Sequence, residues 1–330
     1  MNSFGTLFRV SIFGESHGES VGIVVDGCPA GLSLTEDDLL PDLERRKGGK
    51  QKGTTPRQEA DYPFFKSGLF NGKTTGFPIS IFFENNNTRS EDYQKQRSIP
   101  RPGHADWVAH QKFGGHEDYR GGGHFSARLT TGLVGAGAIA KKLMNGISIH
   151  ADVTEIAGDK DLERGLQKAI DAKDTVGGIV ECRVSGLPVG LGEPYFDSVE
   201  SVIAHMMFAI PAVRGVEFGT GFEAAKMFGS EHNDAIENMD GKTRTNHAGG
   251  VVGGISNGNE LVFRLAIKPT SSTPKEQTSL NWDTEQQETF SVKGRHDLCV
   301  ALRAPVIVEA ATALVLVDLM LQEQRIKRIL

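Results

Sequence analysis

Residues 101–128 read Arg-Pro-Gly-His-Ala-Asp-Trp-Val-Ala-His-Gln-Lys-Phe-Gly-Gly-His-Glu-Asp-Tyr-Arg-Gly-Gly-Gly-His-Phe-Ser-Ala-Arg, and the rest of the chain is organised around this stretch. Four histidines and six glycines occur in it without the period of a helix or a strand. A long irregular segment in a compact chain is typically functional or disordered. Disorder is not expected, because evenly spaced aromatic residues would anchor the segment: Trp107, Phe113, Tyr119 and Phe125. We therefore predict an irregular but ordered functional site.

The glycine run Gly121–Gly123 precedes Ser126 and a helix-like stretch from Ala127 to Met144. Glycines let backbone N–H groups approach a ligand, and the start of the following helix offers unpaired donors and a positive dipole end. This arrangement suits a phosphate. The same residues are also typical of a flexible linker before a capped helix, so the residue types leave both interpretations open.

The composition of the 330 residues, with 38% hydrophobic and 24% charged side chains, indicates a soluble globular protein with a large core. No repeat, low-complexity tract or linker rich in Pro or Ser marks a boundary, so we predict a single interleaved α+β domain over residues 1–330. The formal net charge of −6 argues against nonspecific nucleic-acid binding.

The three cysteines, Cys28, Cys182 and Cys299, lie far apart and lack a CxxC or Cys/His spacing. They indicate buried free thiols in a reducing compartment. Residues 1–9 lack the apolar segment of a signal peptide, and the longest apolar run, 306–321, contains two carboxylates and is too short to span a bilayer. We expect a cytoplasmic protein without a membrane partner.

Hydrophobic periods and capping signals predict the regular elements. A hairpin-like pair of strands flanks the turn Gly14-Glu15-Ser16-His17-Gly18. The segment Gly135-Ala136-Gly137-Ala138-Ile139-Ala140 matches GxGxxA, but no strand precedes it, so it predicts a closely packed helix instead of a dinucleotide site. Asp197 and Glu200 suggest a capping box for a helix carrying His205 in a structural role. The predicted strands are 7–13, 21–25, 75–84, 178–184, 213–218 and 260–268, and the predicted helices are 35–46, 127–144, 161–173, 197–210 and a long one from Pro305.

A basic segment interrupts this acidic chain, with six cationic residues in 45–57 and no acidic one. A solvated basic face is the default interpretation of such a run. A local excess against the global sign instead suggests an anionic small ligand, since Arg and Lys bind phosphate and carboxylate oxygens through charge-assisted hydrogen bonds. Three later polar segments, 245–250, 268–272 and 293–297, add hydroxyl, histidine and cationic side chains that suit an oxyanion.

Six motifs, in order and over nearly the whole chain, resemble those of the chorismate synthase family. They are Gly14-Glu-Ser-His17-Gly, Arg101-Pro-Gly-His104-Ala-Asp, Asp118-Tyr-Arg-Gly-Gly-Gly123, Asn246-His-Ala-Gly-Gly, Lys268-Pro-Thr-Ser-Ser and Gly294-Arg-His-Asp297. The resemblance implies an anti-1,4-elimination of phosphate from 5-enolpyruvylshikimate 3-phosphate to give chorismate. It implies that reduced FMN is required but not consumed. It further implies a helical layer between antiparallel β-sheets and assembly as a homotetramer.

The resemblance also implies roles for particular residues. His17 would protonate the departing phosphate as general acid, with its pKa raised by the adjacent anion. His104 would lie against the reduced flavin, and Asp297, with Ser16 and Ser126, would help remove the ring proton. The implied substrate-binding residues are Arg46, Lys52, Arg57, Arg128 and Arg295. The implied flavin-binding residues are His124, Phe125, Ser126, Pro211, Ala212, Gly253, Lys268, Pro269, Thr270, Ser271, Ser272 and Arg295.

The chain departs from the commonest family pattern after the glycine run. The family often reads Gly-Gly-Gly-Arg-Ser-Ser-Ala-Arg-Glu, where this chain has His124 and Phe125 in place of the Arg and the first Ser. A histidine weakens the fixed positive charge there. NADPH is a possible reductant, although the sequence carries no dinucleotide fingerprint for it.

Other classes of protein also fit parts of this pattern, although a purely structural role would not explain three oxyanion-like clusters in an acidic chain. A flavin-dependent oxidoreductase is the alternative function, favoured by the GxGxxA string and the flavin-like loops. A metal-binding role for the four histidines is disfavoured, because their spacings fit neither a helical ligand pair nor a strand pair, so we expect no metal site.

Overall fold

The computed structural model describes residues 2–49, 51–57, 59–88, 97–292 and 296–326. Its first sheet is antiparallel with the order β1-β2-β3-β7-β4. The strands are β1 (Ser3–Phe4), β2 (Arg9–Gly14), β3 (Ser20–Asp26), β7 (Ile79–Glu84) and β4 (Phe64–Ser67). The β2–β3 pair is the predicted hairpin, with Ile12 opposite Ile23, and its turn carries His17.

The second sheet is also antiparallel, with the order β10-β13-β9-β8. Its strands are β8 (Ser148–Ile156), β9 (Gly178–Ser185), β10 (Val213–Phe218) and β13 (Leu261–Ile267). In β13 every second side chain is buried, starting from Leu261, because one face of the sheet packs on the helical layer.

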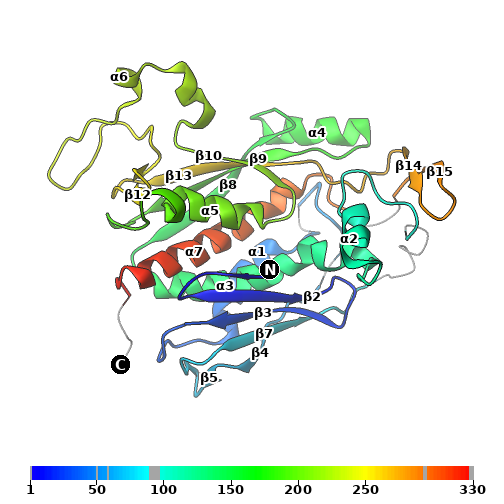
Figure 1. Cartoon of the computed structure of the whole chain (residues 1–330), viewed down its shortest axis with the longest axis horizontal. Coiled ribbons are helices and arrows are strands. Elements are labelled where there is room, and N and C mark those ends of the chain that lie inside the picture. The colour runs from blue at the N-terminus through cyan, green and yellow to red at the C-terminus, as the bar shows by residue number, and fades with distance from the viewer. Residues whose placement is uncertain (1, 50, 58, 89–96, 293–295, 327–330) are drawn as a thin grey trace.

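Two long helices, α3 (Thr130–Leu143) and α7 (Ala304–Gln322), lie between the sheets, as Figure 1 shows. Helix α3 packs on β3 and β7, and α7 packs on β8 and β9. The two helices approach closely at Gly137, where an added Cβ would lie 2.4 Å from the Cβ of Ala310. The GxGxxA segment is therefore a helix–helix contact, and the predicted helical layer between antiparallel sheets is confirmed.

Helix α7 forms the centre of the core. Together with the preceding turn it makes the helical stretch Val300–Gln322, whose length and composition would suit a membrane span, but 89% of its apolar window is buried inside the protein. The run 306–321 judged too short to span a bilayer is thus part of a longer helix, which packs against α3 and against β8 and β9 of the second sheet. Its two carboxylates, Glu309 and Asp318, are both buried.

Glu309 and Asp318 reach partners on other elements. Glu309 accepts two hydrogen bonds of 2.7 Å from Arg45 and one of 3.0 Å from Lys141. Asp318 accepts the backbone N–H groups of Thr6, Leu7 and Phe8 at 2.7–2.8 Å. Glu309 is therefore ion-paired and Asp318 is hydrogen-bonded to backbone N–H groups, which offsets the cost of burying each charge.

The remaining elements surround these layers. The predicted helix 35–46 is a short turn followed by α1, and Asp38 caps its start by accepting the Thr35 N–H at 2.8 Å. The N-cap of α5 is Ser198, so the predicted Asp197 capping box is wrong; the Ser198 Oγ accepts the Ser201 N–H at 3.1 Å. The helices and strands outside the two sheets and the central helical layer are α1 (Leu40–Arg46), β5 (Leu69–Phe70), β6 (Lys73–Thr74), α2 (Asp106–Phe113), α4 (Leu162–Ala172), α5 (Val199–Phe208), α6 (Gly229–His232), β11 (Val251–Val252), β12 (Ile255–Ser256), β14 (Gln277–Asn281) and β15 (Gln286–Phe290).

Residues 101–128 are not irregular throughout, since α2 occupies the middle of the stretch. The helix packs against the β14–β15 connection, where the ring of His110 stacks on Trp282 with 4.6 Å between centroids. It ends at Gly114, which adopts a left-handed conformation. The three cysteines are buried and free, as predicted.

Candidate active site

A cavity of about 800 Å³ opens beside the first sheet and the start of α3. Segments far apart in the sequence line it: β1 and β2, the basic segment, residues 101–128, the α5–β10 connection, residues 268–272 and the start of the last helical stretch. Most of the predicted site residues meet here, namely His17, Arg46, Arg57, His104, His124, Phe125, Ser126, Arg128, Pro211, Ala212, Lys268, Pro269, Thr270, Ser271, Ser272 and Asp297. Ser16 is buried behind this wall.

Besides Ser16, two described site residues, Lys52 and Gly253, are not among those lining the cavity. Lys52 lies at the surface, where its Nζ donates to Gln167 at 3.3 Å. Gly253 lies in the turn between β11 and β12, and a Cβ added there would meet no atom of the described residues within 4 Å. Arg295 lies outside the described residues.

The glycine run makes room for two histidines. Gly121, Gly122 and Gly123 all have positive φ angles, of 60°, 80° and 52°. A Cβ at Gly121 would lie 2.5 Å from the Nε2 atom of His17, and one at Gly122 would lie 3.2 Å from the Nε2 atom of His104. The run is therefore a packed turn that sets the positions of both rings, and this close packing argues against a flexible linker.

His17 sits among cationic side chains. The Arg57 guanidinium donates to the Ser16 Oγ at 3.2 Å and to Glu59 at 2.7 Å, and the Ser16 N–H donates to the Gly123 carbonyl at 3.1 Å. Burial, followed by the positive charge of Arg57, lowers the pKa of His17 below its usual value of 6.5. The protein without a bound anion thus favours neutral His17, so the raised pKa expected for this residue requires the ligand's charge.

His104 forms a hydrogen-bonded triad with Asp106 and Arg101 at the N-terminus of α2. Its Nδ1 atom lies 2.6 Å from the Asp106 Oδ1, and Asp106 also accepts from the Arg101 Nε and Nη2 atoms at 2.8 Å each. Burial opposes ionisation of Asp106, but the hydrogen bonds from Arg101 and His104 outweigh it and hold the pKa of this carboxyl well below its usual range. Arg101 in turn donates to the Ser272 Oγ at 3.2 Å, which joins the triad to residues 268–272.

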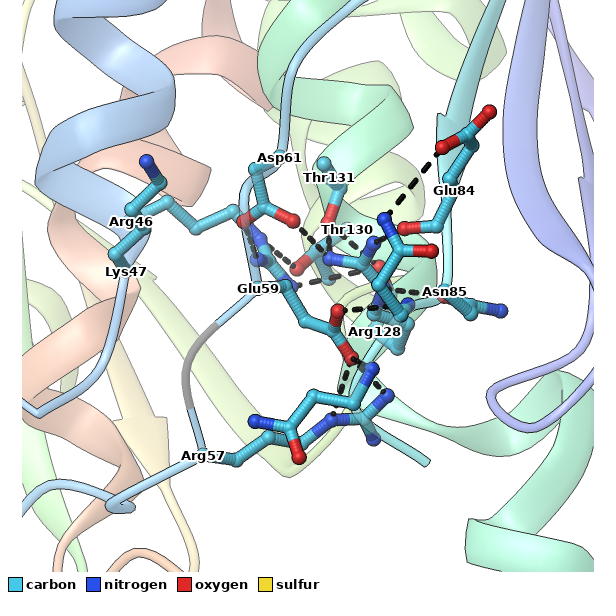
Figure 2. A network of polar contacts seen from close by, with 12 residues as sticks. Arg46, Lys47, Arg57, Glu59, Asp61, Glu84, Asn85, Arg128, Thr130 and Thr131 are labelled. Carbon is cyan, nitrogen blue, oxygen red and sulfur yellow. Dashed lines mark hydrogen bonds and ion pairs between the residues drawn. The ribbon is translucent and has the colours of Figure 1, made fainter. Parts of the chain in front are cut away.

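A buried carboxylate, Asp61, joins two arginines in the wall of the cavity, as Figure 2 shows. Asp61 accepts from the Arg46 Nη1 at 3.2 Å and forms a short contact with the Arg128 Nη1. Arg46 also donates to Thr130, and Arg128 to Asn85, so most of their N–H groups have partners inside the protein. Burial lowers the pKa of Arg46 to about 9, which leaves it charged at neutral pH.

Asp297 is oriented by two donors. Its Oδ1 accepts the Thr55 N–H at 2.7 Å, and its Oδ2 accepts from Arg303 at 3.2 Å. The carboxylate is about nine-tenths buried but lines the cavity. A carboxylate keeps further lone pairs for a ligand when each oxygen accepts one bond.

Two buried polar atoms in the cavity wall, the His124 Nε2 and the Thr270 Oγ1, have no hydrogen-bond partner among the described residues. The other nitrogen of His124, Nδ1, lies 2.8 Å from the Gly14 carbonyl, so it carries the hydrogen and leaves Nε2 for a ligand. Lys268 and Ser271 both donate to the Gly103 carbonyl, and burial, with the charge of Arg214, lowers the pKa of Lys268. The unsatisfied His124 Nε2 and Thr270 Oγ1 are thus available to water or to a bound molecule.

The sequence did not single out several residues of the wall. Arg101 is within a recognised motif, but its role depends on Asp106 and Ser272, and Asp61 gave no signal of its own. His205, predicted to be structural, is exposed on α5, lines the cavity and packs edge-on against Phe4 with 5.3 Å between ring centroids.

The chain is similar to known proteins over nearly its whole length. The family model described as chorismate synthase matches residues 8–321. A chorismate synthase of Chitinophaga pinensis is 68% identical over 330 residues, covering 100% of this chain and 99% of the relative, and one of Dehalococcoides mccartyi is 43% identical over 360 residues with 100% and 99% coverage. A crystal structure of chorismate synthase, 26% identical, has a TM-score of 0.73 and covers 97% of this chain and 93% of its own. The chain therefore belongs to the chorismate synthase family.

Proposed function

We propose that the cavity is the active site for the reaction of this family, the elimination of phosphate from 5-enolpyruvylshikimate 3-phosphate to give chorismate. Membership of the family makes the protein a chorismate synthase, a lyase. The observation that carries the assignment to the cavity is the meeting of His17, His104 and Asp297 in one concave site of about 800 Å³.

The cavity has the features that reduced FMN needs. The unsatisfied His124 Nε2 and Thr270 Oγ1 suit polar atoms of a ligand, and Lys268 supplies positive charge for a phosphate. Pro211 and Ala212 add an apolar wall against which a flat ring can pack. When bound, reduced FMN would supply an electron-rich ring beside the substrate and be recovered unchanged.

His17 would act as the general acid. Its lowered pKa in the free protein keeps it neutral, and the charge of a bound phosphate would favour its protonated form. It would then deliver its proton to the oxygen of the departing phosphate. His104 would exchange a proton with the bound flavin through Nε2, the ring nitrogen that does not face Asp106.

Asp297 would accept the ring proton of the substrate. Thr55 and Arg303 orient its carboxylate, and the Ser126 Oγ, which accepts the Arg128 N–H at 3.3 Å, retains its own hydrogen for donation. Ser16, which is buried next to His17, would also help Asp297 to remove this proton.

The anionic groups of the substrate would meet Arg57 and the residual positive charge of Arg46 and Arg128, which share the single carboxylate of Asp61. Direct substrate contacts by Lys52 and Arg295 remain part of this proposal.

We further propose a homotetramer in the cytoplasm, with residues 1–330 acting as one domain. Gly253 lies away from the cavity of its own chain, so a flavin contact by this residue requires a second copy. Large exposed apolar side chains support such contacts, and they gather on the segment around α6 that extends from the body in Figure 1: Phe222, Phe228, Ile236 and Met239. NADPH would serve as a reductant for FMN, supplied either at this site or by another enzyme.

The test is anaerobic turnover of 5-enolpyruvylshikimate 3-phosphate with and without dithionite-reduced FMN, following phosphate and the absorbance of chorismate. Both products should appear together, only with reduced flavin and without its net oxidation. Tight flavin binding without phosphate release would contradict the proposal and favour a flavin-dependent oxidoreductase. His17→Ala should abolish turnover but leave the flavin Kd within about threefold, since His17 is assigned to the substrate; undiminished turnover would remove His17 from the mechanism.

A further inference from the structure

The ring of His104 has polar neighbours at Nδ1. This atom lies 2.6 Å from the Asp106 Oδ1, whereas a Cβ added at Gly122 would lie 3.2 Å from Nε2, and the residue lines the cavity. The Arg101 Nη2 also lies 3.0 Å from Nδ1. The tautomer of the ring decides which of these neighbours it can bond.

Only one neutral tautomer fits these neighbours. With a hydrogen on Nδ1, the ring donates to Asp106, while Arg101 donates to the same carboxylate instead of to the ring. With the hydrogen on Nε2, the lone pair of Nδ1 would face a carboxylate oxygen at 2.6 Å, which is repulsive. The short distance therefore favours the Nδ1–H form and leaves the lone pair on Nε2, the ring nitrogen away from Asp106.

The carboxylate that imposes this choice is itself fixed. The Asp106 Oδ2 accepts from the Arg101 Nε at 2.8 Å and from the Arg101 backbone N–H at 3.0 Å. Arg101 is about 5% exposed and its remaining nitrogen donates to Ser272. The orientation of His104 is thus fixed through Asp106 by a buried guanidinium that also contacts the proposed flavin wall.

We propose that Asp106 is a positioning residue for the reaction, which holds the ring of His104 in the Nδ1–H tautomer so that Nε2 exchanges protons with the bound cofactor. This inference rests on the proposed function of His104, but the tautomer itself does not. Removing the charge of Asp106 should change which nitrogen of His104 carries the hydrogen without preventing the flavin from binding.

Asp106→Asn tests the proposal with a side chain of the same shape. The amide oxygen is expected to replace Oδ2, because that position accepts two N–H groups of Arg101 whereas Oδ1 accepts one, from Nη2. Nη2 loses this acceptor but lies 3.0 Å from Nδ1 of His104, to which it can donate instead. The amide NH₂ then faces Nδ1 of His104 and donates to it, which places the ring hydrogen on Nε2. The matched control is Glu117→Gln, since Glu117 pairs at 3.3 Å with Nδ1 of His110, which lies on α2 like Asp106.

The measurement is ¹⁵N NMR of histidine-labelled protein at a pH where the rings are neutral, with the His104 signals assigned from their loss in His104→Gln. Wild-type His104 should show Nδ1–H and Asp106→Asn should show Nε2–H. The variant's kcat should fall by about 10- to 100-fold with KM and the flavin Kd within about threefold, while Glu117→Gln keeps kcat within about twofold.

Two results would overturn the proposal. One is an Nε2–H signal for His104 in the wild-type protein, a result that does not depend on whether the variant folds. The other is Asp106→Asn with kcat within about twofold of wild type. Loss of activity in His104→Gln together with full activity in Asp106→Asn would refute only the positioning role, whereas full activity in His104→Gln would refute the proposed function of His104 itself.

Discussion

Replacing Asp61 by asparagine removes the negative charge that Arg46 and Arg128 share in the cavity wall. The three side chains are between 3% and 6% exposed, so the two guanidinium groups cannot turn to bulk water when the carboxylate is lost. Asparagine can accept from one arginine with its oxygen, but its NH₂ group then faces N–H donors of the other. The variant therefore keeps the shape of the network in Figure 2 and loses its charge balance.

The expected loss in the free energy of unfolding follows from this burial. Removing one partner of a buried ion pair typically costs about 3–5 kcal/mol, and the adjoining cavity, which water can enter, places Asp61→Asn at about 3 kcal/mol. An unfolding entropy of about 2.1 cal/mol/K per residue gives about 0.7 kcal/mol/K for 330 residues. We therefore expect Tm to fall by about 4 °C.

The assay is thermal unfolding by calorimetry at pH 7, with Glu223→Gln as the control. Glu223 forms an ion pair with Lys226 in which both side chains are more than half exposed, so its loss should change stability by less than about 0.5 kcal/mol. A Tm of Asp61→Asn within about 1 °C of the wild-type value would show that the two arginines do not depend on this carboxylate.

Three further predictions concern protonation, the core carboxylate and helix packing. Since the pKa of His17 lies below 6.5 in the free protein, binding of the phosphorylated substrate at pH 7 should be accompanied by uptake of at most one proton. Calorimetry in buffers of different ionisation enthalpy measures this uptake. Equal proton uptake in His17→Gln would show that His17 is not its source. Burial opposes ionisation of Glu309, but its cationic partners outweigh it and lower the pKa below 4.5. The stabilisation from the ionised carboxylate is therefore present above pH 4.5 and lost as pH falls further. Glu309→Gln should lower the free energy of unfolding in urea by about 2–3 kcal/mol at pH 7. The same difference between variant and wild type at pH 3 would contradict this. Gly137→Ala should destabilise the protein by about 1–3 kcal/mol because its Cβ would meet Ala310, whereas Gly229→Ala, with no atom within 4 Å, should be nearly neutral; equal unfolding midpoints would refute the close contact.

The elements that the sequence predicted well are those whose signals are local. The β2–β3 hairpin, the helix after Ala127 and the long helix from Pro305 each carry a periodic apolar pattern or a capping residue. Helix α2 escaped prediction because Ala109 is its only buried residue, so no apolar period marks it. Its position depends instead on the stack of His110 on Trp282, a contact between distant segments.

The candidate site divides in the same way. Motifs identified His17 and His104 as site residues, because their turns carry distinctive glycines. Asp61 and Asp106 could not be assigned from the sequence, since a carboxylate shows its role only when the cationic partners are in place. Gly253 matches a family position and yet lies away from the cavity, because motif order carries no information on distance within one chain.

The contact of Asp318 with residues 6–8 has a consequence for how the protein folds as it is synthesised. Its partners precede it by 310–312 residues, so nearly the whole chain must leave the ribosome before the carboxylate can accept their N–H groups. The segment that precedes β2, including the β1 residues that line the cavity, must wait for α7. Contacts of such long sequence separation slow folding, and they leave early strands exposed to wrong partners in the interval. We expect the cavity to be among the last parts of the molecule to form, so that ligand binding reports completed folding of the chain.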